Sequence, residues 1–169
     1  MASHAKPQDY PEAFLGNADP DPVEVANPDG RSPFVITCEH AGRTTPARLG
    51  DLGLDDRHLR RHIAWDIGVE GVGRALAKLL DAPVFFQRYS RLVIDCNRPT
   101  WAEDSIPEVS DGTKVPANIS LTNEERRARY SHIHEPFHDA VADCIDQRLA
   151  QGRTTALIAL HSFTPRLEA

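Results

Sequence analysis

The stretch PFVITC at residues 33–38, followed at once by EHAG at residues 39–42, decides the fold class of this 169-residue chain. Its dense run of β-branched and apolar side chains is typical of a strand buried on both faces of a parallel sheet. The run TALIAL at residues 155–160 is similar and also ends at polar residues, His161 and Ser162. Because helical patterns lie between these strands, the sequence predicts an α/β fold whose mostly parallel or mixed sheet is flanked by helices.

Between these two strands, the sequence predicts further alternation of helices and strands. Residues 55–80 have a mostly helical pattern, and residues 84–86 and 92–96 are predicted as two more strands. Within the helical segment, five apolar residues recur at helix spacing and predict one buried stripe: Val69, Val72, Leu76, Leu79 and Leu80. The proline-containing residues 99–120 are predicted to form a covering loop.

A long helix is predicted after this loop. Thr122 and Glu125 have the spacing of a capping box, and the helical pattern continues to near Gly152. Pro136 lies inside this segment and has no backbone N–H to donate. We therefore expect it to kink or split the helix.

Length and composition limit the class of protein. We expect residues 1–32, which contain several prolines, to form an irregular arm and residues 33–169 to form a single α/β domain. The net charge of -6 disfavours a nucleic-acid partner, because polyanion binding generally needs a basic surface. We also expect no membrane partner and a cytoplasmic location, since no apolar run approaches the roughly 18 residues of a membrane span. Three cysteines without C-x-x-C spacing predict reduced thiols.

Polar side chains follow three of the predicted strands: His40, the pair Asn97-Arg98, and His161. Because open α/β sheets bind ligands at the carboxyl ends of their strands, we expect these side chains to meet at one edge. Two imidazoles and one carboxylate make a catalytic zinc site, in which the metal lowers the pKa of bound water to about 7. Asp66 is the best candidate carboxylate. The alternatives are that His40 only bonds to a turn and that Asp66 only caps the following helix.

Two other histidine pairs compete for a metal role. His58 and His62, and likewise His134 and His138, are four residues apart and can lie on one helix face. Charged helices often carry such pairs in solvent, and we favour the solvent-exposed interpretation.

The stretch SRLVIDCNRP at residues 90–99 places Arg91 and Arg98 at the two ends of an apolar run. An arginine guanidinium binds a carboxylate through two parallel hydrogen bonds, and Asn97 supplies a further donor. The segment is therefore predicted to hold a substrate carboxylate. The alternative is that Arg91 forms a structural ion pair with Asp95.

Four separated motifs occur in a fixed order along the chain: CEHAG at residues 38–42, HIAWDIG at 62–68, SRLVIDCNRP at 90–99 and HS at 161–162. Together they resemble the N-formylglutamate amidohydrolase family over about residues 33–163. The resemblance implies a hydrolase-like domain whose fold is similar to that of zinc-dependent carboxypeptidases.

The resemblance also implies a reaction. Zinc would be held by His40, Asp66 and His161, which match the metal ligands of the family. The implied activity is hydrolysis of the formyl or other acyl group of a small anionic N-acyl amino acid, such as N-formyl-glutamate.

Substrate-binding residues follow from the same resemblance. Asn97 and Arg98 match the pair that binds the free carboxylate of the substrate, and Arg91 is available to polarise the scissile carbonyl. Chains of the family continue well beyond the His-Ser motif and add a late carboxylate suited to general-base work, whereas only residues 163–169 follow here. Glu39 is the candidate substitute for that base. The alternative is a truncated, non-catalytic module of the same fold that binds a metal or an anion.

Overall fold

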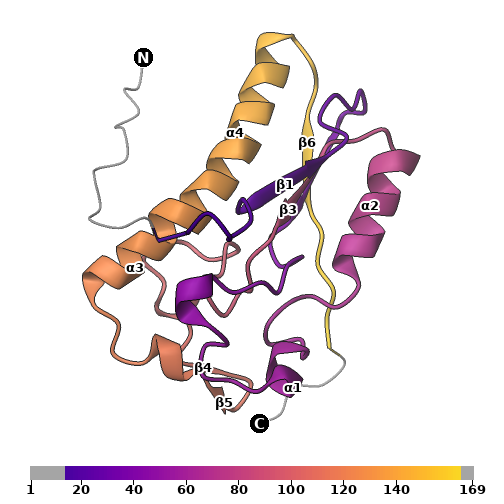
Figure 1. The fold of residues 1–169 in the computed structure, drawn as a ribbon. Helices are drawn as coiled ribbons and strands as arrows, with labels where there is room; N and C mark the ends of the chain where they lie inside the picture. The colour runs from indigo at the N-terminus through magenta and orange to yellow at the C-terminus, as the bar shows by residue number, and fades with distance from the viewer. Residues whose placement is uncertain (1–13, 165–169) are drawn as a thin grey trace.

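The structure, a computed structural model, describes residues 14–164 and contains a four-stranded mixed sheet (Figure 1). The strands are β1 (Val23–Ala26), β2 (Phe34–Cys38), β3 (Val84–Gln87) and β6 (Ala156–Ala159), in the spatial order β1-β3-β2-β6. β2 pairs in parallel with both β3 and β6, so the carboxyl ends of these three strands lie at the same edge. The predicted α/β class with a mixed sheet is confirmed.

The N-terminal arm contributes the fourth strand. β1 runs antiparallel to β3, with Val23 opposite Gln87 and Ala26 opposite Val84. The expectation of an irregular arm is therefore wrong for this segment. Its prolines flank the strand and do not interrupt it, so its backbone N–H groups remain available for pairing. Residues 1–13 of the arm lie outside the described residues.

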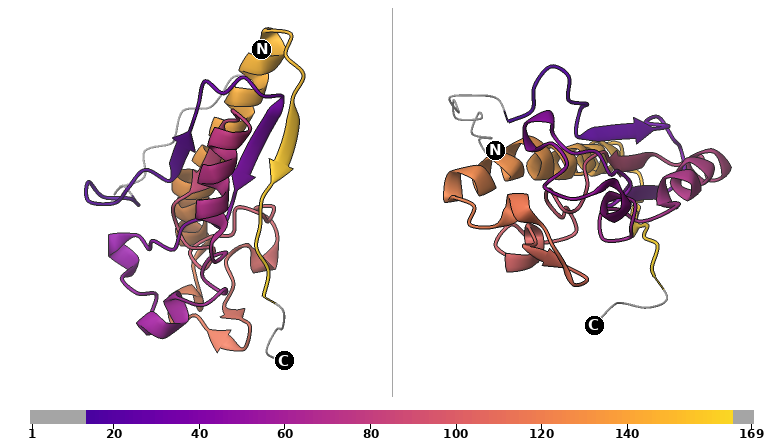
Figure 2. Two further views of the ribbon diagram at one scale, coloured as in Figure 1. Left: turned by 90° about the vertical axis from the view of Figure 1, so that its right-hand side faces the viewer. Right: turned by 60° about the horizontal axis from the view of Figure 1, so that its bottom comes forward.

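Two helices cover opposite faces of the sheet. α2 (Val69–Leu79) and α4 (Glu135–Ala150) lie on either side of it in Figure 1, and in the left view of Figure 2 α2 lies in front with α4 behind. The side chains of β3 alternate accordingly. Val84 and Phe86 belong to the core beneath α2, whereas Phe85 belongs to the core beneath α4. The result is three layers, helix on sheet on helix.

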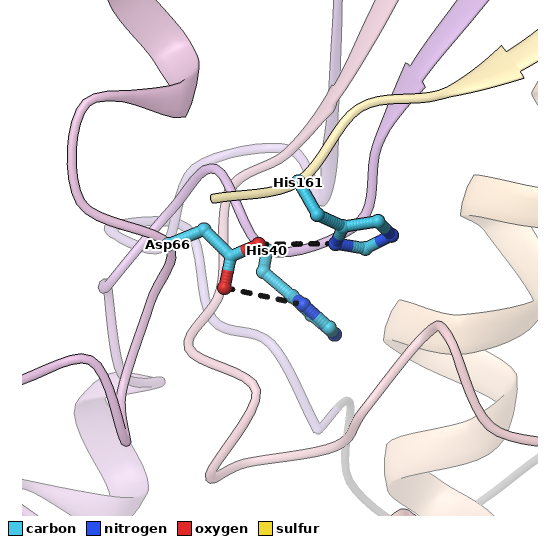
Figure 3. Close-up of side chains that lie close together, drawn as sticks. All are labelled: His40, Asp66 and His161. Atoms are coloured by element: carbon cyan, nitrogen blue, oxygen red, sulfur yellow. Dashed lines mark hydrogen bonds and ion pairs between the residues drawn. The ribbon is translucent and has the colours of Figure 1, made fainter. Parts of the chain in front are cut away.

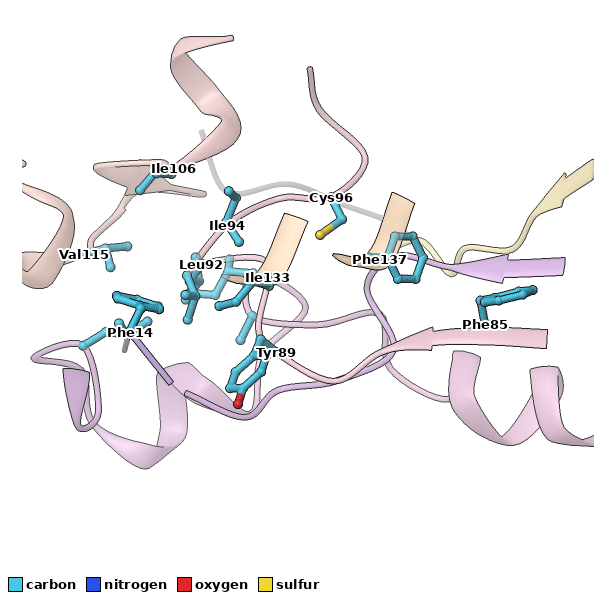
Figure 4. Close-up of a cluster of buried hydrophobic side chains, with 14 of the residues drawn as sticks. Phe14, Phe85, Tyr89, Leu92, Ile94, Cys96, Ile106, Val115, Ile133 and Phe137 are labelled. Atoms are coloured by element: carbon cyan, nitrogen blue, oxygen red, sulfur yellow. The ribbon is translucent and has the colours of Figure 1, made fainter. Parts of the chain in front are cut away.

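The larger hydrophobic core extends from the sheet into the loops beyond it (Figure 4). Tyr89, Leu92, Ile106 and Ile133 have no exposed surface there, and Phe14 closes the cluster from the N-terminal side. Apolar packing of this kind anchors the loops that follow the strands. The loops that carry polar side chains are therefore held on a packed base.

Residues 92–96 form a buried loop, so the prediction of a strand there is wrong. Leu92 and Val93 have no exposed surface, yet their carbonyl oxygens accept hydrogen bonds from side chains. Asn118 Nδ2 donates to the first at 2.8 Å, and Arg129 Nη1 donates to the second at 2.9 Å. A buried apolar run needs partners for its backbone, and side chains supply them here in place of a neighbouring strand.

The predicted helix over residues 55–80 is interrupted. α1 (Asp56–Leu59) is a single turn, and turns occupy most of residues 60–68 before α2 begins. Gly68, with φ at 85°, takes the left-handed conformation at the N-cap of α2, which glycine adopts without steric cost. The chain is thereby redirected just after the HIAWDIG motif.

Small residues form the face by which α2 packs on the sheet. Val69, Gly73 and Ala77 are buried there, whereas Val72 and Leu79 are 51% and 80% exposed. The predicted apolar stripe is therefore wrong for most of its members. Where a helix lies close to a sheet, the residues between them must be small as well as apolar.

α3 (Asn123–Arg129), a π-helical turn (Tyr130–His134) and α4 follow one another directly. The predicted capping box is confirmed, since the Thr122 hydroxyl accepts a hydrogen bond from the Glu125 backbone and the Glu125 carboxylate accepts one from the Thr122 backbone. Pro136 lies in the first turn of α4. The predicted split thus falls at the π-helical turn just ahead of it.

The predicted loop over residues 99–120 carries only short elements. They are the 3-10 turns Glu103–Ser105 and Pro116–Asn118 and the hairpin strands β4 (Val109–Ser110) and β5 (Thr113–Lys114); a further 3-10 turn, Ala47–Leu49, precedes α1. Across residues 14–164, none of the helices has the length and apolar character that crossing a bilayer requires.

Candidate metal and substrate site

Three segments bring His40, Asp66 and His161 together beyond the carboxyl ends of β2 and β6 (Figure 3). His40 follows β2, His161 follows β6, and Asp66 comes from the turns before α2. One potential ligand atom of each residue lies within 4.8 Å of the other two. The structure thus gathers, at one edge of the sheet, the three residues that the sequence analysis assigned to one site.

His40 is 2% exposed, and its two ring nitrogens face different carboxylates. Its Nε2 lies 2.6 Å from Asp95 Oδ1, and its Nδ1 lies 3.5 Å from Asp66 Oδ1. Burial acts to lower the pKa of His40, but the proximity of the Asp66 and Asp95 carboxylates outweighs it and raises this pKa above its ordinary value. The ring is therefore held by side chains, and the alternative in which His40 only bonds to a turn is wrong.

Asp66 connects the two histidines. Its Oδ2 lies 3.0 Å from His161 Nδ1 and accepts a hydrogen bond from the Ser162 backbone N–H at 3.2 Å. The N-cap of α2 is Gly68 and has no side-chain hydrogen bond, so Asp66 does not cap that helix. Burial acts to raise the pKa of Asp66, but bonding to His40 and His161 outweighs it and lowers the pKa. The carboxyl group is therefore ionised, the form that binds a cation.

Among residues 14–164, three buried polar atoms of this site find no hydrogen-bond partner: Nδ1 of His40, Nε2 of His161 and Oε2 of Glu39. Buried polar atoms are nearly always hydrogen-bonded, so several unpartnered ones within one cluster of side chains indicate a place for a ligand. The separation of 3.5 Å between His40 Nδ1 and Asp66 Oδ1 is close to the ~3.3 Å between two ligands of a tetrahedral zinc ion. Two imidazoles and one carboxylate therefore fit zinc in both chemistry and spacing.

Glu39 lies at the rim of this cluster and is 8% exposed. Its Oε1 accepts a hydrogen bond from the Thr37 hydroxyl at 2.6 Å, and its Oε2 is 3.6 Å from His161 Nε2. The Thr37 contact orients the carboxylate, while Oε2 stays available to a ligand. Glu39 is thus near enough to the cluster to exchange a proton with a group bound there.

Arg91 forms the ion pair with Asp95 that the sequence analysis considered as an alternative, with Nη2 2.7 Å from Oδ2. Its Nη1 is also 3.7 Å from Asp66 Oδ1, so it lies beside the metal cluster as well. Burial acts to raise the pKa of Asp95, but His40, Arg91 and the Asn97 backbone N–H outweigh it and hold the pKa at about 2. Asp95 is therefore ionised at any physiological pH.

Asn97 and Arg98 lie on the outer side of the same loop. Asn97 is exposed, and its backbone N–H donates to Asp95 Oδ1 at 2.8 Å. The half-buried Arg98 donates from Nε to Asp104 Oδ2 at 2.7 Å and from Nη1 to the Asn97 carbonyl at 3.3 Å. The structure therefore places Asn97 next to the cluster through Asp95, whereas the Arg98 guanidinium is turned toward Asp104.

The sequence analysis missed the role of Asp95 toward His40. A signal was present, because Asp95 is enclosed in the apolar run of residues 92–96, and an ionised acid in such surroundings needs partners. Its partners come from distant parts of the chain, and no spacing rule identifies them.

The competing histidine pairs lie outside the cluster. Among residues 14–164, neither pair belongs to a three-ligand group. His58 Nδ1 is 2.6 Å from Asp55 Oδ1, which is a pairing within α1 and its cap. His134 is only 8% exposed, so the solvent-exposed interpretation is wrong for it, while His138 is exposed.

Comparison with known proteins places this geometry in a family. A family model for N-formylglutamate amidohydrolase matches residues 32–169. The gene product Atu2144 from Agrobacterium tumefaciens has a similar solved structure, with 40% sequence identity and a TM-score of 0.88 over 90% of this chain and 60% of that chain. N-formylglutamate amidohydrolase from Ralstonia eutropha JMP134 is similar in fold, with 21% identity and a TM-score of 0.62 over 87% of this chain and 63% of that chain. No curated protein matches.

The chain therefore spans less than two thirds of the length of either solved structure. The family match nevertheless begins just before β2 and includes His40, Asp66, His161 and the loop at residues 90–99. We conclude that this chain belongs to the N-formylglutamate amidohydrolase family.

Proposed function

We propose that this chain carries the site of a zinc-dependent amidohydrolase that removes the formyl or other acyl group from a small anionic N-acyl amino acid, such as N-formyl-glutamate. Membership of the family supports amide hydrolysis as the class of reaction. The observation that carries the proposal is the cluster of His40, Asp66 and His161, in which two buried nitrogen atoms lack hydrogen-bond partners among the described residues.

His40, Asp66 and His161 would hold the zinc ion. When bound, zinc supplies Lewis-acid chemistry, which polarises a carbonyl oxygen and makes water acidic enough to react near neutral pH. Asp95 faces the opposite nitrogen of His40 and fixes the orientation of the ring. Ligands on loops after parallel strands are what a zinc-carboxypeptidase-like fold would provide, and that wider likeness stays a prediction.

Glu39 is the proposed general base. Its Oε2 has no hydrogen-bond partner in the part of the chain that the structure describes and lies near His161, while Thr37 holds the other oxygen. The carboxylate would take a proton from the attacking water and return it to the leaving amine as the C–N bond breaks. The products are then the carboxylic acid, which is formate for a formyl group, and the free amino acid.

Arg91, Asn97 and Arg98 are the proposed substrate contacts. Arg91 lies between Asp66 and Asp95 at the edge of the cluster, where its guanidinium can donate to the carbonyl oxygen of the substrate. Asn97 and Arg98 lie further out and would bind the carboxylate. For this, Arg98 exchanges its exposed ion pair for the substrate, an exchange that costs little because solvent-exposed pairs are weak.

Zinc content and formate release test the proposal on purified protein. We expect one zinc ion per chain and release of formate from N-formyl-L-glutamate that a chelator stops and added zinc restores. E39Q should keep its zinc and lower kcat by about 10²–10⁴-fold. Absence of zinc, or turnover that resists the chelator, would contradict the proposal. Stoichiometric zinc without turnover would instead identify a non-catalytic metal-binding module.

A further inference from the structure

One face of the helix after the capping box presents three rings to the loop that carries Asp95, Asn97 and Arg98. The rings belong to Tyr130, His134 and His138, which are four residues apart. The centroids of Tyr130 and His134 are 6.1 Å apart in an edge-on arrangement, and those of His134 and His138 are 4.4 Å apart. The three side chains thus form a continuous column.

The two histidines bind the backbone on either side of Asn97. His138 Nε2 lies 2.9 Å from the carbonyl oxygen of Cys96, and His134 Nε2 lies 3.0 Å from that of Arg98. Carbonyl oxygens only accept, so each Nε2 carries the hydrogen and each imidazole is the donor. Two rigid donors from one helix therefore hold the peptide units that flank Asn97.

Tyr130 reaches the same loop through Ser105. The Tyr130 hydroxyl is 3.0 Å from Ser105 Oγ, and the Ser105 carbonyl accepts a hydrogen bond from the Asp95 N–H at 2.7 Å. Asp95 in turn faces His40. The column therefore contacts the loop directly at Cys96 and Arg98 and is linked to Asp95 through Ser105.

A π-helical turn lies at the start of this column. It spans Tyr130–His134, between the first and second rings of the column. A π-turn closes hydrogen bonds from i to i+5 and is wider than an α-turn, so it changes which residues of the following helix share a face with those before it. Turns of this kind are rare and occur frequently at functional sites.

Burial favours the neutral form of His134. Its side chain is mostly buried, and burial lowers its pKa, with His138 acting in the same direction and the Arg98 carbonyl and Asp95 opposing. A donor without charge fixes a backbone carbonyl and adds no cation to compete for the substrate carboxylate. Asn97, by contrast, remains exposed to solvent.

We propose that His134 and His138 are positioning residues, which hold the peptide units around Asn97 so that Asn97 and Arg98 bind the carboxylate of the substrate. This inference rests on the proposed function. Neither side chain belongs to the metal cluster, so their effect is on substrate binding and not on zinc content.

Paired variants at His138 and His134 test the proposal by kinetics. H138A removes the exposed donor, whereas the side-chain amide of H138Q keeps an N–H near the position of Nε2. At the buried site, the shorter side chain of H134N does not reach the position of Nε2, whereas that of H134Q does. We expect H138A and H134N to raise KM for N-formyl-L-glutamate by about tenfold with kcat changed less than twofold, and the Gln variants to stay near wild type. H132A is the matched control on the same helix, since His132 Nδ1 bonds to the Ala128 carbonyl of its own helix.

Amide hydrogen exchange gives a readout that needs no turnover. The Arg98 N–H donates to the Asp95 carbonyl at 3.1 Å, and we expect its exchange to accelerate in H138A and H134N but not in H138Q, H134Q or H132A. If the wild-type protein shows no turnover, the proposed function fails and this exchange alone decides whether the histidines hold the loop. The inference would be overturned if KM and the exchange of the Arg98 N–H were both unchanged in H138A and H134N. It would also be overturned if H138Q and H134Q were as impaired as H138A and H134N.

Discussion

The Nε2 atom of His40 lies 2.6 Å from Oδ1 of Asp95, inside a loop whose neighbouring side chains are apolar. This contact connects the two parts of the proposed site. Asp95 orients a proposed metal ligand on one side, and on the other it accepts the backbone N–H of Asn97 and pairs with Arg91. A change at Asp95 should therefore affect both metal binding and substrate binding.

Replacing Asp95 by asparagine is expected to weaken zinc binding about 10–100-fold. The reason is that a carboxylate behind a metal-binding imidazole fixes the ring and raises its basicity, and an amide does so less well. Competition with a chromophoric chelator measures the zinc affinity. D104N is the control, because Asp104 is exposed and pairs with Arg98 and not with a proposed metal ligand. Equal zinc affinity in D95N and wild type would contradict the role assigned to Asp95.

Replacing Arg129 by methionine is expected to destabilise the protein by about 2–4 kcal/mol. Arg129 is 1% exposed and donates to the carbonyls of Val93 and Ala117 and to the side chain of Asn118. Methionine fills similar space but leaves those buried acceptors without a donor. Urea unfolding monitored by circular dichroism measures the free energy of unfolding.

The exposed Arg127 in the same helix is the control for that measurement. R127A should change the free energy of unfolding by less than about 0.5 kcal/mol. A similar small loss in R129M would show that the loop at residues 92–96 holds its shape without the guanidinium.

Two glycines of α2 should respond in opposite directions to alanine. A Cβ at Gly71 meets none of the described residues within 4 Å, so G71A is expected to stabilise the protein by about 0.5–1 kcal/mol through helix propensity. A Cβ at Gly73 would lie 2.7 Å from the Phe86 ring and 3.1 Å from Cys38 Sγ, so G73A is expected to destabilise it. Thermal unfolding of the two variants side by side measures both effects. Equal shifts in the two variants would contradict the close packing of α2 on the sheet.

His134 should make stability fall on mild acidification. Burial, its largest influence, lowers the folded-state pKa of His134 below the unfolded value of about 6.5, so the unfolded chain binds the proton more readily. The contribution of neutral His134 to the free energy of unfolding is therefore complete above pH ~6.5. It is lost as the pH falls from there through the folded-state pKa. H134Q, which does not titrate, should lose less stability than wild type over that interval. Urea unfolding at several pH values measures this loss. An equal loss of unfolding free energy in wild type and H134Q across this interval would contradict a lowered pKa of His134.

Local signals in the sequence predicted much of the fold. The apolar runs of β2 and β6 end at polar pairs, and the capping box at Thr122 is a contact within one helical turn, so neighbours in the chain were enough to find them. Prediction failed at residues 92–96, because the same apolar pattern serves a strand or a buried loop. The loop forms because the side chains of Asn118 and Arg129, which come from later segments of the chain, bind its backbone carbonyls.

By itself, the sequence determined the α/β class, the positions of β2, β3 and β6, and the identity of His40, Asp66 and His161 as one group. Strand ends and motif residues are local features, and parallel strands bring their carboxyl ends to one edge. Tertiary structure alone decided that Asp95 holds His40 and that the helix after the capping box holds the loop around Asn97. Those contacts join side chains to groups far away along the chain, and only packing of the folded core sets which buried polar atoms find each other.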